Sequence, residues 1–392
     1  MNDNQHIPTG YKPSPLGIIP EDWEVKRLGD CFNISAGRDL EKDYYSETIT
    51  PECRYPIFSN SLENKGLYGY TSKPRHYANS ITITGRGSLG HAEYRDSDFD
   101  AIIRLLVLTP KIDISCELIT NYINFAEPFI YESTGVPQLT APQIQNTLLL
   151  LPPYEEQLQI MCFLKLWDTA IAKQTALIEQ LTLRKRGLMQ QLLTGKKRLK
   201  GFEGEWKRIK AGEIFKSISI KGNGSETLLS ATQEHGVIPR DQLEGRVTMP
   251  TGDTNSFKLV EVGDFVISLR SFQGGLEYSE HRGIVSPAYT VLKPIVEIDK
   301  PFYRYYFKSA EFIGHLAIAV IGIRDGKQIS YEDFCFVKIP FPNIEEQKVI
   351  SAVLLQADKE IEIQKQKLAA LQEQKKGLMQ VLLPGKKRIR II

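Results

Sequence analysis

A long internal repeat constrains this chain more than any other feature of its sequence. Glu155 aligns with Glu345, and the alignment runs without a gap to Arg198 and Arg388. Across these 44 paired positions, 20 residues are identical. Because a repeat in sequence marks a repeated structural unit, we expect the two halves of the 392-residue chain to share one architecture.

Upstream of this block the similarity fades, although some landmarks persist. Residues 23–32 face residues 206–215, Arg86 faces Arg270, and Gln138 faces Gln328. The difference between the similar block and the divergent segments upstream of it favours a shared helical scaffold that carries two domains with different surfaces. A plain gene duplication that drifted is the simpler alternative, but drift alone does not explain why one block was spared.

The repeat predicts four segments along the chain. Variable domains are expected over residues 1–151 and 199–341, and repeated helical segments over residues 152–198 and 342–392. The expected fold class is mixed α/β (α+β), with two domains joined by two long antiparallel helices in a pseudo-twofold repeat.

Each repeated segment has the pattern of a long helix. Residues 155–193 contain no Pro and one Gly, and Pro152-Pro153 and Gly195 punctuate the two ends. Spacings of three and four residues define a heptad seam in each copy. The first seam comprises Ile160, Leu164, Trp167, Ile171, Gln174, Ile178, Leu181, Lys185, Leu188 and Leu192. The second seam comprises Ile350, Leu354, Ala357, Ile361, Gln364, Leu368, Leu371, Lys375, Leu378 and Leu382.

The polar interruptions fall at the same steps in both seams. Gln174 and Gln364 lie near the middle of their helices, so antiparallel pairing would bring their amides together and penalise slipped registers. A solvent-facing Gln is the alternative. Met161, Leu177 and Leu183 lie outside the seam, and we expect them to be exposed for a helical partner.

A basic run follows each helix. Lys196, Lys197 and Arg198 recur as Lys386, Lys387 and Arg388. A solvated face, phosphate contact and interaction with the helix C-terminus are three alternatives for these charges.

Glycine-rich polar loops follow the expected strands at residues 80–84 and 265–269. Arg, Lys, Asn and Gln are the side chains that bind base edges and phosphates, which favours nucleic-acid contact, although plain turns are the alternative. The candidate DNA-contacting residues are Ser59, Asn60, Lys65, Arg86, Ser88, Gln138, Thr232, Arg270, Ser271, Gln273, Arg324, Lys327 and Gln328.

Composition excludes several classes of protein. The net charge of +2 gives only weak support for an anionic partner, and no apolar run is long enough to span a membrane. The N-terminus lacks the pattern of a secretory signal, so we expect a cytoplasmic protein. The scattered cysteines are expected to be reduced packing residues. These are Cys31, Cys53, Cys116, Cys162 and Cys335.

Catalytic motifs are missing from the sequence. There is no phosphate-binding GxxxxGK[ST] loop and no HExxH or paired metal spacing among the histidines. The best match to the amine-orienting motif of DNA methyltransferases is Leu151-Pro152-Pro153-Tyr154, and Leu151 cannot accept the required hydrogen bond. We therefore expect a helix lead-in here and a chain that is not an enzyme.

The chain has the order domain, helix, domain, helix, with Pro-Pro-x-Glu-Glu-Gln before the first helix and Gly-Leu-Met-Gln near the end of both. In this order and these motifs it resembles the HsdS family of type I restriction-modification specificity subunits. The resemblance implies that each variable segment reads one half of a bipartite double-stranded DNA site. It also implies that the repeated helices form an antiparallel spacer and dock methyltransferase subunits, with two expected, which the restriction and translocase subunits then join.

The resemblance implies no cofactor in this chain; S-adenosylmethionine, ATP and Mg²⁺ would be bound by the partner subunits. Because the two domains differ, the DNA site should be asymmetric, and half-sites ~34 Å apart lie within reach of the helices. A stand-alone DNA-binding regulator or adaptor on the same scaffold is the alternative from another class.

Overall fold

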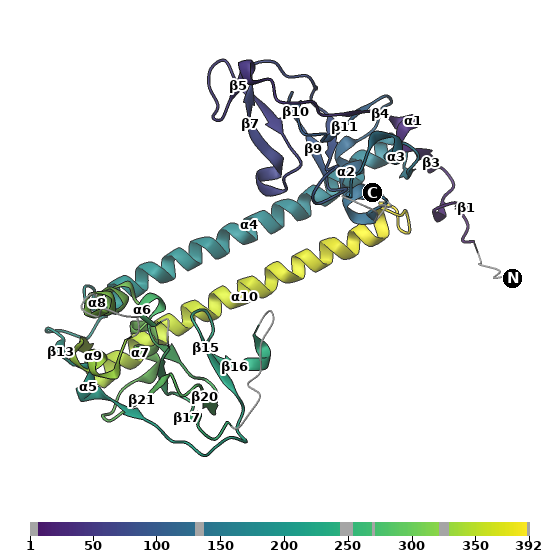
Figure 1. Ribbon diagram of the computed structural model, residues 1–392. Coiled ribbons are helices and arrows are strands. Elements are labelled where there is room, and N and C mark those ends of the chain that lie inside the picture. Colours follow the sequence, from purple (N-terminus) through teal and green to yellow (C-terminus); the bar gives the residue numbers. More distant parts are fainter. Residues whose placement is uncertain (1–6, 130–136, 244–253, 269–270, 321–328, 390–392) are drawn as a thin grey trace. The chain divides into compact units, whose positions relative to one another are not determined.

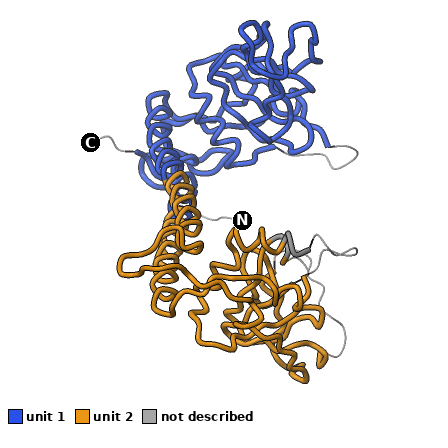
Figure 2. Tube along the Cα trace, turned by 90° about the vertical axis from the view of Figure 1, so that its left-hand side faces the viewer, with its two compact units in different colours: residues 1–173, 368–392 blue, residues 174–367 orange. Residues whose placement is uncertain are grey.

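The chain forms two compact units, which are coloured separately in Figure 2. The first unit comprises residues 1–173 and 368–392, and the second comprises residues 174–367. The computed structural model describes residues 7–129, 137–243, 254–268, 271–320 and 329–389. Each unit contains one variable domain and part of both long helices.

The variable domain of the first unit is built from short strands and short helices (Figure 1). Its strands are β1 (Tyr11–Ser14), β2 (Gly17–Pro20), β3 (Glu24–Arg27), β4 (Phe32–Ala36), β5 (Tyr45–Ser46), β6 (Tyr55–Phe58), β7 (Leu67–Thr71), β8 (Ser80–Ile83), β9 (Ala92–Arg95), β10 (Asp100–Ala101), β11 (Leu106–Pro110) and β12 (Leu148–Leu151). Its helices are α1 (Leu28–Cys31), η1 (Lys42–Tyr44), η2 (Glu63–Gly66), α2 (Cys116–Ala126) and α3 (Ala141–Ile144).

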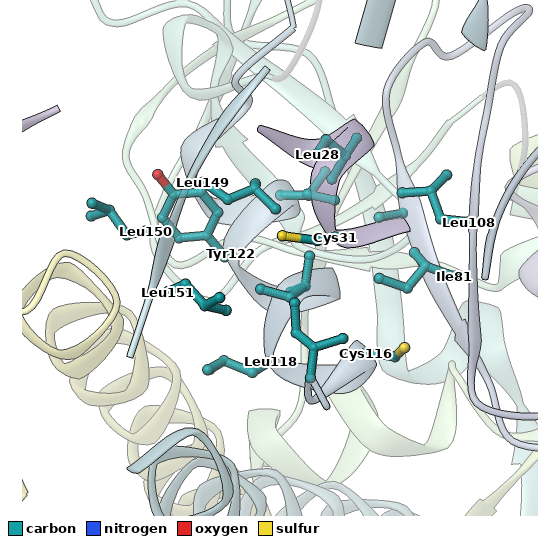
Figure 3. Packing of buried hydrophobic residues seen from close by; sticks show 14 of the residues in the cluster. Leu28, Cys31, Ile81, Leu108, Cys116, Leu118, Tyr122, Leu149, Leu150 and Leu151 are labelled. Carbon is teal, nitrogen blue, oxygen red and sulfur yellow. The ribbon is translucent and has the colours of Figure 1, made fainter. Parts of the chain in front are cut away.

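A four-stranded antiparallel sheet, in the order β4-β11-β8-β9, forms the centre of this domain. All four residues of β8 are buried, as expected for a central strand covered on both faces. Helix α2 packs on β8 and β9 and contributes Leu118 and Tyr122 to the core that Figure 3 shows, together with Ile81 and Leu108 of the sheet. In a second sheet, β10-β6-β7-β5, strands β6 and β10 each precede one of the loops described below.

The second unit repeats this plan. Its strands are β13 (Lys207–Lys210), β14 (Phe215–Ile218), β15 (Leu229–Thr232), β16 (Gly236–Pro239), β17 (Lys258–Val260), β18 (Phe265–Ile267), β19 (Glu277–Tyr278), β20 (Gly283–Val285), β21 (Thr290–Pro294) and β22 (Lys338–Phe341). Its short helices are α5 (Ala211–Ile214), η3 (Arg240–Gln242), α6 (Ser271–Gly274), α7 (Lys300–Tyr306), α8 (Ala310–Val320) and α9 (Tyr331–Phe336).

The two domains share one core and differ elsewhere. The sheet β14-β21-β18-β19 has the same strand order as its counterpart, and β13 pairs with β22 as β3 pairs with β12. In place of the second four-stranded sheet, the second unit has the pairs β15-β16 and β17-β20. The repeat and the mixed α/β class are thus confirmed, and the differences lie in the parts of the domains that surround the shared sheet.

Two helices of 39 residues, α4 (Tyr154–Leu192) and α10 (Ile344–Leu382), continue from one unit into the other. The sequence places both helices correctly to within one residue at each end, and β12 with Pro152-Pro153 leads into α4 as predicted. In the first unit Lys375 pairs with Asp168 at 2.5 Å, and in the second Lys185 pairs with Asp358. Later residues of α4 pair with earlier residues of α10, so the helices are antiparallel.

Two expectations about side-chain exposure were wrong. Met161 is 4% exposed, because the domain of the first unit covers that face of α4 and Asn121 contacts the Met161 sulfur. Cys162, expected to be a packing residue, lies on the outer face of the same helix and is exposed. Leu177 and Leu183 are exposed as predicted.

Within the described ranges, no helix combines the length and apolar character that a bilayer crossing requires.

Candidate nucleic-acid interface

Four loops of the first unit meet beside the end of β8. Gly85 begins the loop after this strand, and a Cβ atom there would lie 2.8 Å from the Leu139 carbonyl oxygen and 3.1 Å from that of Arg104. Only glycine lets the three backbones approach so closely. Residues 85–90, 102–105 and 137–140 are therefore packed together.

Asn60 joins the fourth loop to the other three. Its side-chain Nδ2 donates to the Ile103 carbonyl at 2.6 Å, and its Oδ1 accepts from the Gly85 backbone N–H at 2.8 Å. Ser59 is buried, and its Oγ donates to the Gly66 carbonyl across the base of the same loop. We call residues 59–66, 85–90, 102–105 and 137–140 the loop cluster.

The loop cluster exposes side chains of the kind that bind DNA. Lys65, Arg86, Ser88, Arg104 and Gln138 are all exposed. The guanidinium of Arg86 lies 3.5 Å from the Gln138 side-chain oxygen, so two residues far apart in sequence face the same solvent. Three cations against a single carboxylate, that of Glu63, make this surface electropositive. Such a set suits phosphates and base edges.

A buried arginine, which the sequence analysis missed, supports this surface from below. Arg95 on β9 donates to the Thr82 hydroxyl and to the Lys65 carbonyl, both at 2.9 Å, and its guanidinium lies 3.5 Å above the Phe58 ring. Burial lowers the pKa of Arg95 to about 10, so the side chain remains a cation at neutral pH. Arg95 thus fixes the backbone at Lys65 and adds positive charge below it.

Two pairs of consecutive non-glycine residues in the loop cluster have a left-handed backbone: Asn64 with Lys65, and Ile103 with Arg104. Ile103 has φ 54° and Arg104 has φ 62°. For a β-branched residue this conformation is uncommon, and each such residue costs about 1–3 kcal/mol. No local sequence signal predicts it, which is why the sequence analysis did not single out Ile103 and Arg104.

In the second unit the structure describes the side chains of two predicted residues, Thr232 and Ser271. Thr232 closes a turn, because its hydroxyl donates to the Gly236 carbonyl and accepts from the His235 N–H. Ser271 is buried, and its Oγ accepts from the Ser268 N–H. The other candidates of this unit, namely Arg270, Arg324, Lys327, Gln328 and the side chain of Gln273, lie outside the described residues.

Every predicted seam position on α4 and α10 is buried or half-buried. In the second unit the two central glutamines meet: Gln174 Nε2 donates to Gln364 Oε1 at 2.9 Å and to the Gln364 carbonyl at 3.1 Å. Gln174 is 6% exposed. The structure thus shows the two glutamines paired and Gln174 buried, not facing solvent, while a penalty on slipped registers stays a prediction.

An ion cluster closes each end of the helix pair. In the first unit Glu156, at the start of α4, accepts from the Arg388 guanidinium at 2.5 Å and from the buried Trp23 indole at 3.0 Å. The bonds that Arg388 donates to Glu156 and Asp22 raise the pKa of Arg388. In the second unit Glu346 accepts from Arg198 and Trp206 at 2.7 and 2.9 Å.

The arginines of the basic runs therefore form ion pairs within the protein, a role different from a solvated face, phosphate contact or interaction with the helix C-terminus. Arg198 and Arg388 pair with carboxylates that begin the opposite helix, and are not free for phosphate. The flanking lysines are exposed. Each repeat thus supplies an arginine to the carboxylate of the other repeat.

The glutamine after each of these carboxylates attaches the helix to its domain. Gln157 accepts from the Ser115 N–H and donates to the Pro152 carbonyl. Gln347 makes the same two bonds, to the Asp299 N–H and the Pro342 carbonyl. Ser115 and Asp299 cap α2 and α7, so the repeated Glu-Glu-Gln motif connects helix, cap and domain core.

The chain is similar to curated proteins and to solved structures. The chain is 26% identical over 408 residues to a type I restriction enzyme specificity subunit of Methanocaldococcus jannaschii, covering 95% of this chain and 94% of that protein. It resembles the crystal structure of a type I restriction-modification S subunit from M. genitalium, with TM-score 0.56, 18% identity and coverage of 92% and 96%. A structure described as showing complex assembly and conformational transition of the type I R-M system gives TM-score 0.60, 18% identity and coverage of 94% and 99%.

A family model adds the decisive match, because it fits the chain twice and in register with the repeat. The model for the type I restriction modification DNA specificity domain matches residues 20–183 and 203–373. Each match begins near the tryptophan that binds the ion cluster and extends into one of the long helices. With two such domains, each followed in sequence by a long helix, the chain belongs to the family of type I restriction-modification DNA specificity subunits, the non-catalytic subunits that recognise DNA.

Proposed function

We propose that the chain reads a bipartite, asymmetric DNA site, with one half-site bound by residues 1–151 and the other by residues 199–341. The loop cluster carries this proposal, because four separate segments converge to expose Lys65, Arg86, Arg104 and Gln138 on one electropositive surface. The pairs β15-β16 and β17-β20, which the second unit has in place of the sheet β10-β6-β7-β5, support an asymmetric site. Residues 152–198 and 342–392 would set the spacing between half-sites.

The proposal gives the predicted residues two roles. Arg86 and Gln138 contact base edges, while Lys65 and Ser88 contact phosphates. Ser59, Asn60, Thr232 and Ser271 use their polar atoms within the protein and hold loops in place. In the second domain the remaining candidates stay predictions, and they are Arg270, Gln273, Arg324, Lys327 and Gln328.

The proposed partners are two methyltransferase subunits, which the restriction and translocase subunits then join. Apolar side chains that the helix seam leaves exposed support docking along the helices; they are Leu166, Leu177, Leu183 and Ile363. S-adenosylmethionine, ATP and Mg²⁺ would be bound by those subunits, and the complex would act in the cytoplasm, on chromosomal or incoming DNA.

A selection experiment tests the proposal. The full chain, purified with its methyltransferase subunits, would be used to enrich duplexes from a random-sequence pool. We expect two conserved blocks of different sequence separated by unconserved positions. A single continuous block, or no enrichment, would contradict the proposal.

Substitution of Arg86 then assigns one block to the first domain. Losing a contact of this kind costs about 1–3 kcal/mol, so Arg86→Ala should weaken binding about 10- to 100-fold and relax one block only. Arg27, an exposed arginine on β3 outside the loop cluster, gives the control Arg27→Ala, which should bind like wild type. Equal loss in both variants would mean that Arg86 contributes only general charge.

A further inference from the structure

We infer that Ile103 is a specificity-determining residue that contacts the C5-methyl group of a thymine in the half-site read by the first domain. This inference rests on the proposed function and deepens it. No polar pattern in the sequence points to Ile103; the structure does, through its exposure, its backbone and its neighbours.

Ile103 stands out from its flanking residues by its exposure. Ile102 and Leu105 are each 1% exposed and belong to the core, whereas Ile103 is 46% exposed. The chain leaves the core after Ile102 and returns to it at Leu105, and the apolar side chain of Ile103 lies exposed between these two buried residues. A core-filling role is therefore excluded for this side chain.

The surrounding structure holds this tip firmly. The Ile103 N–H donates to the Arg38 carbonyl at 3.1 Å, the Arg104 N–H donates to the Gly37 carbonyl at 3.2 Å, and Asn60 holds the Ile103 carbonyl. Gly37 has no room for a side chain, because a Cβ atom would lie 2.7 Å from the Ala101 carbonyl. Strained residues that are held in this way occur at sites of ligand contact.

The residues around Ile103 indicate which kind of ligand its side chain contacts. Arg104 follows it directly, and Asn60 bonds both to Ile103 and to the glycine that precedes Arg86. An exposed aliphatic group on a loop cluster that also exposes Arg86 and Arg104 is suited to a duplex, whose phosphates pair with the cations. Inside the major groove the apolar feature of a base edge is the thymine methyl group, and aliphatic side chains contact it.

The test removes only that methyl group. In synthetic duplexes carrying the selected site, each thymine of the half-site that depends on Arg86 is replaced in turn by uracil. Wild-type chain with its methyltransferase subunits should bind about three- to tenfold less tightly when one particular thymine is replaced. No sensitivity at any thymine, with intact binding to the site, would overturn the inference and leave the proposed function standing.

The variant Ile103→Asn separates contact from folding. Asn tolerates a left-handed backbone better than Ile, so the variant should keep or raise the melting temperature. It should bind thymine and uracil duplexes equally. Ile49, exposed elsewhere in the first unit, gives the control Ile49→Asn, which should keep the wild-type ratio.

Two results with Ile103→Asn would overturn the inference. A retained preference for thymine would show that another group contacts the methyl. An equal loss of affinity for both duplexes, with an unchanged ratio, would indicate a general wedge between base pairs. Failure of the wild-type chain to enrich any site would instead refute the proposed function itself.

Discussion

Single residues hold each end of the helix pair in place. Glu156 is 6% exposed and accepts from a buried indole and from an arginine near the other end of the chain. Removing one partner from such a cluster leaves polar groups buried and unpaired. The repeat uses the same device at Glu346, so the two clusters can be tested separately.

We predict that Glu156→Ala destabilises the first unit by about 2–4 kcal/mol, because the buried Trp23 N–H loses its acceptor and Arg388 keeps only its bonds to Asp22. In calorimetry of the full chain one transition should shift down by roughly 5–10 °C. The neighbouring exposed Glu155 gives the control, and Glu155→Ala should leave the transition in place. A shift of equal size in both variants would mean that helix-end charge, and not the cluster, is responsible.

Residue types alone told only part of this site. The repeated Trp, Glu and Arg mark the members of the ion clusters in sequence. Which carboxylate each arginine binds could not be read from one repeat, because that carboxylate lies in the other repeat. Asn60 has the composition of a base-reading residue, yet its amide is bonded within the protein. Whether a polar side chain faces solvent or its own backbone depends on tertiary packing, which a short loop sequence does not encode.

At the scale of elements the seam of the long helices was the most predictable feature. The spacing of apolar residues and the Pro and Gly residues at the ends locate α4 and α10, because a helix of 39 residues repeats its apolar pattern many times. Short strands carry little signal, and the order β10-β6-β7-β5 depends on contacts between distant segments. The second sheet was therefore not predicted.

The central glutamine pair should specify register at a cost in stability. We predict that the double variant Gln174→Leu with Gln364→Leu melts at or above the wild-type temperature, because two leucines would bury apolar surface where an amide pair now lies. Its preference among duplexes with different half-site spacing should become weaker. A lower melting temperature with unchanged spacing preference would contradict the register role.

The exposed apolar face of the helices should determine assembly. We predict that Leu183→Asp, at a position 62% exposed, leaves the fold intact and weakens co-purification with the methyltransferase subunits. Ile49→Asp is the matched control in a domain loop, also highly exposed. Seam residues such as Ile178 and Leu368 are less suitable, since a charge there would disturb helix pairing. Undiminished co-purification of Leu183→Asp would place the partner elsewhere.

For the molecule as a whole, we propose that the helix pair is the spacer between two half-sites. Both helices pass through both units, and each residue adds ~1.5 Å to a helix, so 39 residues extend ~58 Å. Inserting residues into one helix alone would break the pairing seen at Gln174 and Gln364. Insertion into both helices keeps that pairing.

The most direct test lengthens both helices by one heptad, after Gln174 in α4 and after Ile363 in α10, so that the inserted segments face each other. Seven residues add ~10 Å, which corresponds to about three base pairs of duplex. If the helix pair sets the spacing, we expect selection to recover the same two sequence blocks, with the unconserved gap between them longer by about three base pairs. Recovery of the original gap with undiminished affinity would contradict the spacer role of the helix pair.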